Sequence, residues 1–330
     1  MNLPDGLVAR PLEPTDAGVM YELFAASELA DTGEVAVEPE DIEGDWQRPS
    51  FDLATESIGV FDGESLVAAA EVYKTRRAEA TVHPDHRGRG IGSWLARWVE
   101  DCSRRRGGHL VGQSVPVGSS AEQLYRSLGY RHGWQSWVLV VPEGAAIAPQ
   151  PLATGYTLRD LVPAGAGDEG VGVEGVGGEG VGGEGVGGEG VAGEGGGDAH
   201  AAYRLVEDAF NEWPDRQPSS FEDWAAGTVR RPGFEPWQIR FAVDPDGIPV
   251  GVAFTIVADG CGYVDQLAVR ADQRGRGLAR ALLVDAFERA REHGATRSEL
   301  STDSRTGALP LYEHVGMVVS KRYQHWMTDV

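Results

Sequence analysis

Apolar positions follow a helical period in two places along the chain, and each place is flanked by shorter strand-like runs. The first stripe covers residues 91–102 and ends before Gly107 and Gly108, and the second covers residues 279–290 and ends before Gly294. A glycine after the last periodic residue is typical of a helix end. Both stripes predict amphipathic helices whose apolar side chains face a core: Ile91, Trp94, Leu95, Trp98, Val99 and Cys102, then Ala279, Leu282, Leu283, Ala286 and Ala290.

The landmarks around these helices repeat at a fixed spacing. The interval from Arg87 to Tyr125 is the same as the interval from Arg274 to Tyr312. AEQLYRSLGY (121–130) and ALPLYEHVGM (308–317) share the pattern A-x-x-L-Y-x-x-x-G. A repeat of this length predicts two domains of one fold. Each copy begins with a strand and one or two helices, continues with several strands, and ends with a helix and a strand. This order predicts an α/β (α+β) fold with a mixed central sheet flanked by helices.

The predicted domains are residues 1–142 and 154–330, joined by a Pro- and Ala-rich linker at residues 143–153. The interval from Arg159 to Arg274 is longer than the matching interval from Arg10 to Arg87, so the second copy carries an insertion. A tract at about residues 165–198 repeats V-G-G-E-G and accounts for the added length. Its period fits neither helix nor strand, and ordering so many glycines and glutamates is costly. The tract is therefore predicted to be a disordered acidic, Gly-rich insertion in the second domain.

Composition narrows the class of protein. The chain has 330 residues, enough for two domains that each bury a core, and its net charge of −22 disfavours nucleic acid and anionic membranes as partners. One cysteine lies in each half, which disfavours a disulfide framework. The longest strongly apolar run, around Trp137 to Val141, is too short to span a bilayer, and the first residues lack the apolar core of a signal peptide. We expect a cytoplasmic monomer or homodimer without a metal.

Two glycine-rich turns open the two amphipathic helices. They are HRGRGIG (86–92) and QRGRGLA (273–279), and both fit R-x-x-G-x-[GA]. Glycine can adopt backbone angles that let successive amide N–H groups converge, and the positive end of a helix dipole adds to such a cradle. The turns therefore predict sites for a phosphate or pyrophosphate. Neither turn fits G-x-G-x-x-G or a P-loop.

A strand ending in L-A-V, the R-x-x-G-x-[GA] turn and A-x-x-L-Y-x-x-x-G together resemble the GCN5-related N-acetyltransferases, or GNATs. The resemblance covers nearly the whole chain outside the repeat tract, and the tandem layout is similar to that of mycothiol synthase and other two-domain members. It implies acetyl-CoA as cofactor and acetyl transfer to a primary amine of a small molecule. The residues that it implies for acetyl-CoA are Leu267, Ala268, Val269, Arg274, Gly275, Arg276, Gly277, Leu278 and Ala279, with Val82, Arg87, Gly88, Arg89, Gly90, Ile91 and Gly92 in the first copy.

The same resemblance suggests the catalytic acids. By family position, Tyr312 in the second copy and Tyr125 in the first protonate the leaving sulfur, and a phenol is protonated at neutral pH, as this role requires. Many relatives carry a glutamate early in the strand before the turn, but Tyr263 and Arg76 stand at the matching positions.

The general base has several candidates. Strand alternation is expected to place Asp265 on the same face as Leu267 and Val269, where apolar neighbours would raise its pKa. Glu79, Glu299 and a chain of water molecules are the alternatives. Because the first copy has Ala78 in place of Asp265, the active site is expected in the C-terminal domain, and the first copy either binds CoA without turnover or is structural.

The acceptor is expected between the early helices and the sheet. In the second copy this region is NEWPDRQPSSFEDW, where Glu212, Trp213 and Asp215 are candidates for binding a cationic amine, unless the Trp-Pro pair only packs a loop. The usual Asn before A-x-x-L-Y is missing, and Ser304 and Arg305 stand in that region. Two other functions remain open: a mycothiol synthase-like acetyltransferase, and a CoA-binding sensor or scaffold without catalysis.

Overall fold

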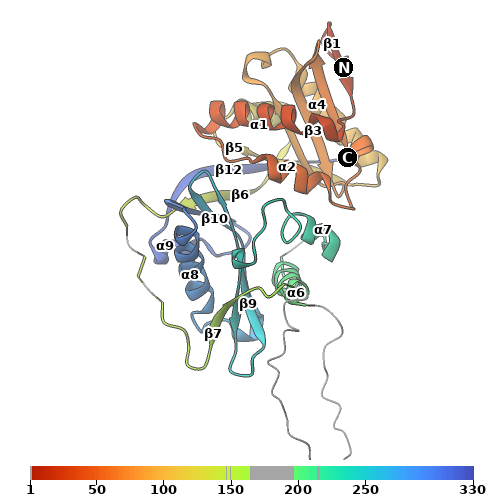
Figure 1. Ribbon diagram of the computed structural model, residues 1–330. Coiled ribbons are helices and arrows are strands. Elements are labelled where there is room, and N and C mark those ends of the chain that lie inside the picture. The colour runs from red at the N-terminus through yellow and green to blue at the C-terminus, as the bar shows by residue number, and fades with distance from the viewer. Residues whose placement is uncertain (1, 146, 149, 164–196, 214–215) are drawn as a thin grey trace, which may run out of the picture.

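The computed structural model describes residues 2–145, 147–148, 150–163, 197–213 and 216–330 (Figure 1). The predicted insertion lies outside these residues except for positions 197 and 198, and Asp215 lies outside them entirely. The first half contains β1 (Leu7–Arg10), η1 (Pro14–Asp16), α1 (Ala17–Thr32), α2 (Pro39–Trp46), α3 (Leu53–Glu56), β2 (Ser57–Asp62), β3 (Ser65–Tyr73), β4 (Arg77–Val82), η2 (Pro84–His86), α4 (Ile91–Arg105), β5 (Leu110–Pro116), α5 (Ser120–Ser127) and β6 (Arg131–Val140).

The second half repeats this order after the linker. It contains β7 (Thr157–Asp160), α6 (Asp198–Phe210), α7 (Phe221–Ala226), η3 (Pro236–Gln238), β8 (Ile239–Val243), β9 (Pro249–Ala258), β10 (Cys261–Val269), η4 (Ala271–Gln273), α8 (Leu278–Glu292), β11 (Arg297–Asp303), α9 (Leu309–Val315) and β12 (Val318–Asp329).

Both halves place helices on the two faces of a sheet. In the first half α4 packs on one face through Ile91 and Leu95, while α1 and α2 cover the other through Met20 and Ile42. In the second half α8 covers one face, and α6 and α7 cover the other. The predicted fold, a mixed sheet flanked by helices, is confirmed.

The strands of the described residues form one twelve-stranded sheet in the order β1-β2-β3-β4-β5-β12-β6-β11-β10-β9-β8-β7. Its centre is an exchange of strands between the halves. β6, from the first half, pairs with β11, and β12, from the second half, pairs with β5. β6 and β12 also pair with each other, so two long strands join the halves in Figure 1. Each half therefore supplies a strand that completes the sheet of the other.

The helices after the glycine turns form as their apolar stripes predict. Ile91, Leu95 and Val99 of α4 are buried, as are Leu282 and Leu283 of α8. Each helix begins directly after a glycine in the left-handed region, with φ of 88° at Gly90 and 79° at Gly277. A side chain with a Cβ would be strained there, so these glycines fix the direction in which each turn enters its helix.

Candidate active site

The glycine turn of the first half opens onto a deep groove. Gly88 and Gly90 both have positive φ, and a Cβ atom built on either would meet no other atom within 4 Å. The groove has a volume of about 750 Å³, which is in the range of ligand sites. It runs from the turn past the splayed ends of β4 and β5 to α5. The predicted acetyl-CoA residues that line it are Val82, Arg87, Gly88, Gly90, Ile91 and Gly92, whereas Arg89 lies exposed on the turn beside His86.

The first arginine of each turn connects the turn to the end of the preceding strand and to an acidic side chain in the helical region before the sheet. The Nε of Arg87 donates to the carbonyl of Val82 at 3.2 Å, and its two Nη atoms bind Asp31 of α1 at 2.6 and 2.9 Å. Arg274 repeats this with the carbonyl of Val269 at 3.0 Å and with Glu212 at 2.6 and 2.8 Å. Glu212 was a candidate for binding the acceptor amine. In the structure its carboxylate is instead paired with Arg274 of the turn.

The strands that bound the groove separate after one residue pair. β4 and β5 pair in parallel only at Arg77 and Gly112, and beyond that point the side chain of Gln113 bridges the gap. Its Oε1 accepts from the amide of Ala80 at 3.1 Å, and its Nε2 donates to the carbonyl of Ala80 at 2.8 Å. Gln113 thus satisfies both backbone groups of Ala80 at the gap. Sequence reasoning missed this residue because a lone glutamine carries no pattern.

Tyr125 reaches the same gap from α5. Its hydroxyl donates to Oε1 of Gln113 at 2.7 Å, its ring lies 4.7 Å from that of Tyr130, and it lines the groove. Burial and the nearby charge of Glu100 raise the pKa of Tyr125, so the phenol keeps its proton at neutral pH. Tyr312, its counterpart on α9, belongs to the core cluster of the second half, where burial raises its pKa to about 12.

The linker lies against the glycine turn of the second half. Nε2 of Gln150 would be 3.3 Å from a Cβ built on Gly277, and the hydroxyl of Tyr156 donates to Gln273 at 2.5 Å. Ile147 and Leu152 pack on the core cluster that contains Tyr312. In Figure 1 this segment passes α9 and α8 on its way to β7. The second turn is therefore covered in part by the chain itself.

The other predicted acetyl-CoA residues of the second half are spread between core and surface. Val269 and Leu278 are buried in the α8 cluster, with Leu267 and Ala279 packed against it, and Ala268 packs under α6. Arg274, Gly275, Arg276 and Gly277 are exposed.

Asp265 does not share a face with Leu267 and Val269, so that prediction was wrong. The register of β10 shifts between Val264 and Gln266, and this β-bulge reverses the alternation. Leu267 and Val269 point to the α8 cluster, whereas Asp265 and Tyr263 line a cavity of about 520 Å³ between the halves. The pKa of Asp265 is raised by partial removal from solvent between the halves and then by the charge of Asp41, although its side chain stays exposed to the cavity. The expected direction is found, but the neighbours are acidic and not apolar.

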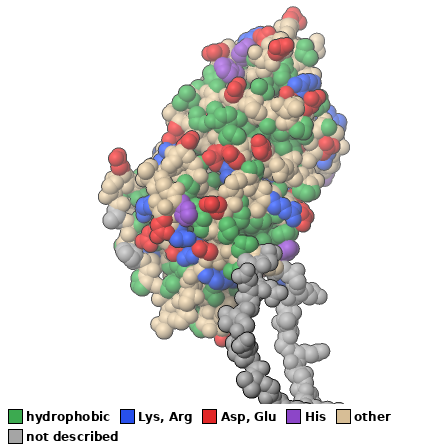
Figure 2. Space-filling view, viewed as in Figure 1, with side chains coloured by type: hydrophobic (Ala, Val, Ile, Leu, Met, Phe, Trp, Pro, Cys, Tyr) green, Lys and Arg blue, Asp and Glu red, His purple; other side chains and the backbone are tan. Residues whose placement is uncertain are grey.

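This acidic cavity lies beside α2. Ten Asp and Glu side chains and five Lys and Arg side chains line it, and Glu299 is among the acids. Figure 2 shows acidic side chains where the two halves meet. The hydroxyl of Tyr263 donates to Ser301 at 2.7 Å, and burial raises the pKa of Tyr263.

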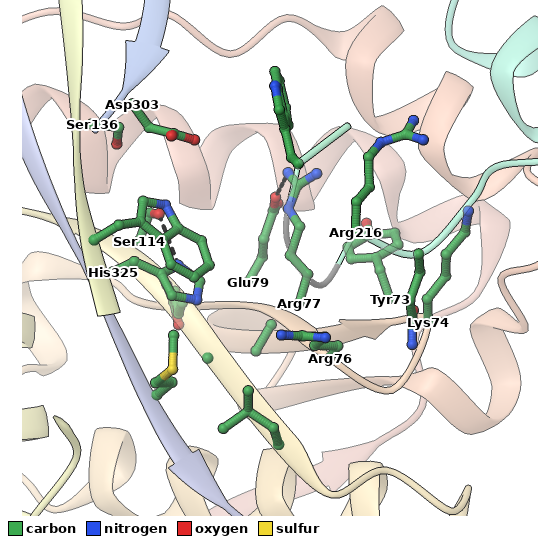
Figure 3. Close-up of a pocket in the computed structure, with 18 of the residues that line it drawn as sticks. Tyr73, Lys74, Arg76, Arg77, Glu79, Ser114, Ser136, Arg216, Asp303 and His325 are labelled. Atoms are coloured by element: carbon green, nitrogen blue, oxygen red, sulfur yellow. Dashed lines mark hydrogen bonds and ion pairs between the residues drawn. The ribbon is translucent and has the colours of Figure 1, made fainter. Parts of the chain in front are cut away.

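A third cavity, of about 790 Å³, lies between the halves beside the gap of β4 and β5 (Figure 3). It shares Phe24, Glu28, Gln113 and Ser114 with the groove, so the two spaces meet at the gap. Trp213 and Glu79 line it, and Glu79 is paired with Arg77.

The exchanged strand β12 brings His325 into this third cavity. Its ring stacks on Trp134 at 3.7 Å, and its Nδ1 lies 3.1 Å from the hydroxyl of Ser114. Burial, with Arg305 and Arg77 nearby, lowers the pKa of His325 to about 3, so the ring is neutral at physiological pH. Sequence reasoning missed His325 because it lies in the other half of the chain from Ser114, and no local pattern connects the two.

A buried carboxyl group lies on the strand next to Glu79. Glu71 on β3 is opposite Glu79 on β4 and is 2% exposed. It accepts from Nε1 of Trp46 at 2.5 Å and from the hydroxyl of Tyr73 at 2.8 Å. Burial and then Glu79 raise the pKa of Glu71 to about 8.

None of the helices in the described ranges combines the length and apolar character needed to cross a bilayer. Within the same ranges, no group of three or more His, Cys, Asp or Glu side chains is arranged to hold a metal ion.

Comparison with known proteins identifies both halves. The model of the "Acetyltransferase (GNAT) family" matches residues 199–317, and that of the "Acetyltransferase (GNAT) domain" matches residues 56–132. The two matches together cover more than half of the chain. Among curated relatives, the mycothiol acetyltransferase of Salinispora arenicola is 28% identical over 78% of this chain and 75% of its own length. That of Thermobispora bispora is 26% identical over 82% of this chain and 81% of its own length.

Solved structures show the same architecture. A GCN5-related N-acetyltransferase from Sphaerobacter thermophilus has a TM-score of 0.71 and 29% identity, covering 99% of this chain and 97% of its own. A tandem GNAT protein from the clavulanic acid biosynthesis pathway has a TM-score of 0.66 at 16% identity, with 98% of both chains covered, and so shows the fold alone. The family uses acetyl-CoA. The chain belongs to the GNAT acetyltransferase family and is an acetyltransferase with two GNAT domains in tandem.

Proposed function

We propose that this enzyme transfers the acetyl group of acetyl-CoA to a primary amine of a small molecule, and that the transfer takes place in the first half. The supporting observation is the contrast between the two glycine turns. The turn at Gly88 and Gly90 opens onto a groove of about 750 Å³, whereas the linker residue Gln150 lies on the turn at Gly277. The expectation that the second half is the active one stays a prediction, and the same experiment decides it.

The residues of the groove fit the cofactor. Gly88 and Gly90 line the groove, and a Cβ at either position would lie in open space, so no side chain there covers the backbone amides that we propose for the phosphates. The first amides of α4 add the positive end of the helix dipole. The free edge of β4 at Ala80 offers one N–H and one C=O to a bound chain once Gln113 moves away. Acetyl-CoA, when bound, supplies the acetyl group as a reactive thioester.

Two side chains at the gap can move protons. Tyr125 holds its proton at neutral pH and can donate it to a leaving group. Glu79 lines the cavity between the halves, on the side from which an amine would approach, and can accept a proton from it. Glu79 therefore replaces Asp265 as the proposed base. It lines both this cavity and the adjoining acidic cavity, whereas Asp265 and Glu299 line the acidic cavity and not the one beside the gap.

The relatives favour a second candidate for the acceptor. The curated relatives are mycothiol acetyltransferases, so a mycothiol-related amine is the first acceptor to offer, in the form of the cysteinyl pseudodisaccharide. The proposal places the reaction in the cytoplasm, where Cys102 and Cys261, both free and buried, would stay reduced. The proposed function is compatible with a monomer or a homodimer, because one chain supplies all the residues of the groove.

Two matched variants test where transfer takes place. Tyr125→Phe and Tyr312→Phe each remove one hydroxyl from a mostly buried ring, and CoA release from acetyl-CoA with an amine panel measures the effect. We expect Tyr125→Phe to lower kcat by at least about tenfold and Tyr312→Phe to leave it within about twofold. The opposite order would place the reaction in the second half. Thermal stabilisation by acetyl-CoA without CoA release from any amine would identify a binding protein instead.

A further inference from the structure

The cavity of about 790 Å³ between the halves has a charge unlike the rest of the molecule. Six Lys and Arg side chains and three Asp and Glu side chains line it, although the chain as a whole carries −22. The basic residues are Arg48, Lys74, Arg76, Arg77, Arg216 and Arg305. The neighbouring acidic cavity has the opposite excess. A surface that is acidic overall has no general need for such a cluster, so the cluster calls for a local reason.

The charges are separated within the cavity. Figure 3 shows Lys74 and Arg216 on one side, Ser114 and His325 on the other, and Arg76 between them. Ser114 lies at the gap between β4 and β5, where the cavity meets the groove. A molecule whose reacting end is at the gap would therefore place its other end among the basic side chains.

Two of these basic side chains are held by carboxylates that do not line the cavity. Arg216 binds Glu207 at 2.5 and 2.9 Å, and Glu207 does not line the cavity. Lys74 lies 3.6 Å from Asp223, which is also outside the lining, and donates to the carbonyl of Pro218 and to Ser219 at 3.1 Å. Such contacts orient a cation. Arg216 has five N–H donors and keeps some for a ligand, whereas the three donors of Lys74 face Pro218, Ser219 and Asp223, so Lys74 would attract an anion through its charge.

The backbone that presents Lys74 is strained. Lys74 has φ of 48° and Thr75 has φ of 61°, in the turn between β3 and β4. Asn and Gly are the residues that adopt these angles readily, and a β-branched residue is an outlier there. Strain of this kind is typical of functional positions. The turn therefore keeps a lysine over the cavity at a cost to its own stability.

We propose that the amine acceptor also carries an anionic group, a carboxylate or a phosphate, which Lys74 and Arg216 bind while the amine lies at the gap beside Ser114 and Glu79. This inference rests on the proposed function, because it assigns the acceptor of the same site. It narrows the substrate class from amines in general to amino acids, amino phosphates and their derivatives. The cysteinyl pseudodisaccharide carries neither a carboxylate nor a phosphate, so a preference for it would contradict this inference. Guanidinium and ammonium groups held by buried carboxylates are suited to both anions.

Pairs of amines that differ only in charge test the inference. 4-Aminobutanoate is compared with 4-aminobutanamide, and 3-aminopropyl phosphate with 3-aminopropanol. For the full-length enzyme we measure kcat/KM by CoA release, and the affinity for each compound by calorimetry with CoA present. We expect at least one anionic compound to exceed its neutral partner by about tenfold or more in both measurements. The two pairs separate a carboxylate from a phosphate.

Substitutions connect the preference to the named residues. Lys74→Asn removes the charge with a residue that tolerates the left-handed backbone, and Arg216→Gln removes the second charge. In each variant the kcat/KM of the anionic acceptor should come within about threefold of that of its neutral partner. The change should arise mainly from a higher KM for the anionic acceptor, while the KM of acetyl-CoA stays unchanged. Lys74→Arg, which keeps the positive charge, should retain the preference of the parent enzyme for the anionic acceptor. Arg104→Gln, at an exposed ion pair with Asp101 on α4, is the matched control and should change nothing.

The results separate this inference from the proposed function. Equal or better use of the neutral partners, or a preference that survives both Lys74→Asn and Arg216→Gln, would overturn the inference and leave acetyl transfer standing. Absence of binding by all four compounds would overturn it as well. If acetyl-CoA itself failed to raise the melting temperature, the proposed function would fail too.

Discussion

The side chain of Gln113, from β5, binds the backbone groups of β4 that the pantetheine arm of acetyl-CoA would use in the proposed site. Its amide forms two hydrogen bonds with the backbone of Ala80 and accepts the hydroxyl of Tyr125. Binding of the cofactor along β4 would therefore displace Gln113 and release Tyr125 for the role of acid that we propose for it. Each of these hydrogen bonds contributes about 1 kcal/mol net, so their loss is a moderate cost to ligand binding.

Replacement of Gln113 by alanine should strengthen acetyl-CoA binding. Gln113→Ala removes the competing amide, and the Kd should fall by about three- to tenfold, since about 1.4 kcal/mol corresponds to a factor of ten. Calorimetry measures the change. Gln123→Ala, which alters an exposed side chain of the same groove, is the control. A Kd that rises several-fold in Gln113→Ala would show that Gln113 holds the ligand.

Glu71 makes stability depend on pH. Its pKa in the folded chain is about 8, against about 4.5 when exposed, because burial disfavours its charged form. Between these values the folded state binds a proton that the unfolded state releases, so this stabilisation is fully present below about pH 4.5 and is lost as pH rises through 8.

Glu71→Gln should remove this dependence. The variant should gain stability relative to the parent from about pH 5 to about pH 8, by up to a few kcal/mol, as measured by urea unfolding at several pH values. His325 acts in the opposite direction, because its lowered pKa costs stability as pH falls below 6.5, but it is unchanged in this comparison. Parallel pH profiles for the two proteins would contradict the account of Glu71.

Residue roles were the part of the site that sequence could predict least. The two tyrosines and the glycines could be selected as candidates because their pattern occurs twice, and their roles stay predictions. The side chains of Arg87 and Arg274 turned out to brace the turns, and a bulge moved Asp265 away from Leu267. Both outcomes depend on contacts between residues far apart in sequence, or on one extra residue in a strand, which periodicity does not record.

At the scale of elements, local sequence patterns were sufficient to predict the two helices that follow the glycine turns. The stripes of α4 and α8 and the glycines that precede them predicted both helices, since burial of an apolar face and left-handed glycine are local properties. The turn between β3 and β4 is the exception, because KTRR contains none of the residues that its backbone angles favour.

Relief of that strain should stabilise the protein. Thr75→Gly lets the backbone adopt its φ of 61° without the Cβ, while the carbonyl of Thr75 can still accept from Ser103. We expect a gain of about 1 kcal/mol and a melting temperature higher by a few degrees. Thr157→Gly, at an exposed position of β7, should instead lose stability. A loss in Thr75→Gly similar to that in Thr157→Gly would show that the turn is not strained.

At the scale of the whole molecule, the exchange of β6 and β12 was beyond sequence reasoning. The duplication predicted two similar halves, but alternation within a strand does not say which strand lies beside it. Because β12 pairs with β5, His325 of the second half lies beside Ser114 of the first, in the cavity between the halves. The contact of Gln150 with the second glycine turn was likewise hidden, because composition predicts a linker at residues 143–153 but not where it packs.

The most direct test of the account is the affinity of acetyl-CoA for two matched variants, Gly90→Asn and Gly277→Asn. Asparagine tolerates the left-handed backbone and caps a helix well, so both variants should fold. Its side chain would enter the open cradle at position 90. Calorimetry should show acetyl-CoA binding at least about tenfold weaker in Gly90→Asn and unchanged in Gly277→Asn. Normal affinity in Gly90→Asn together with weakened binding in Gly277→Asn would contradict the central claim that the first half holds the cofactor.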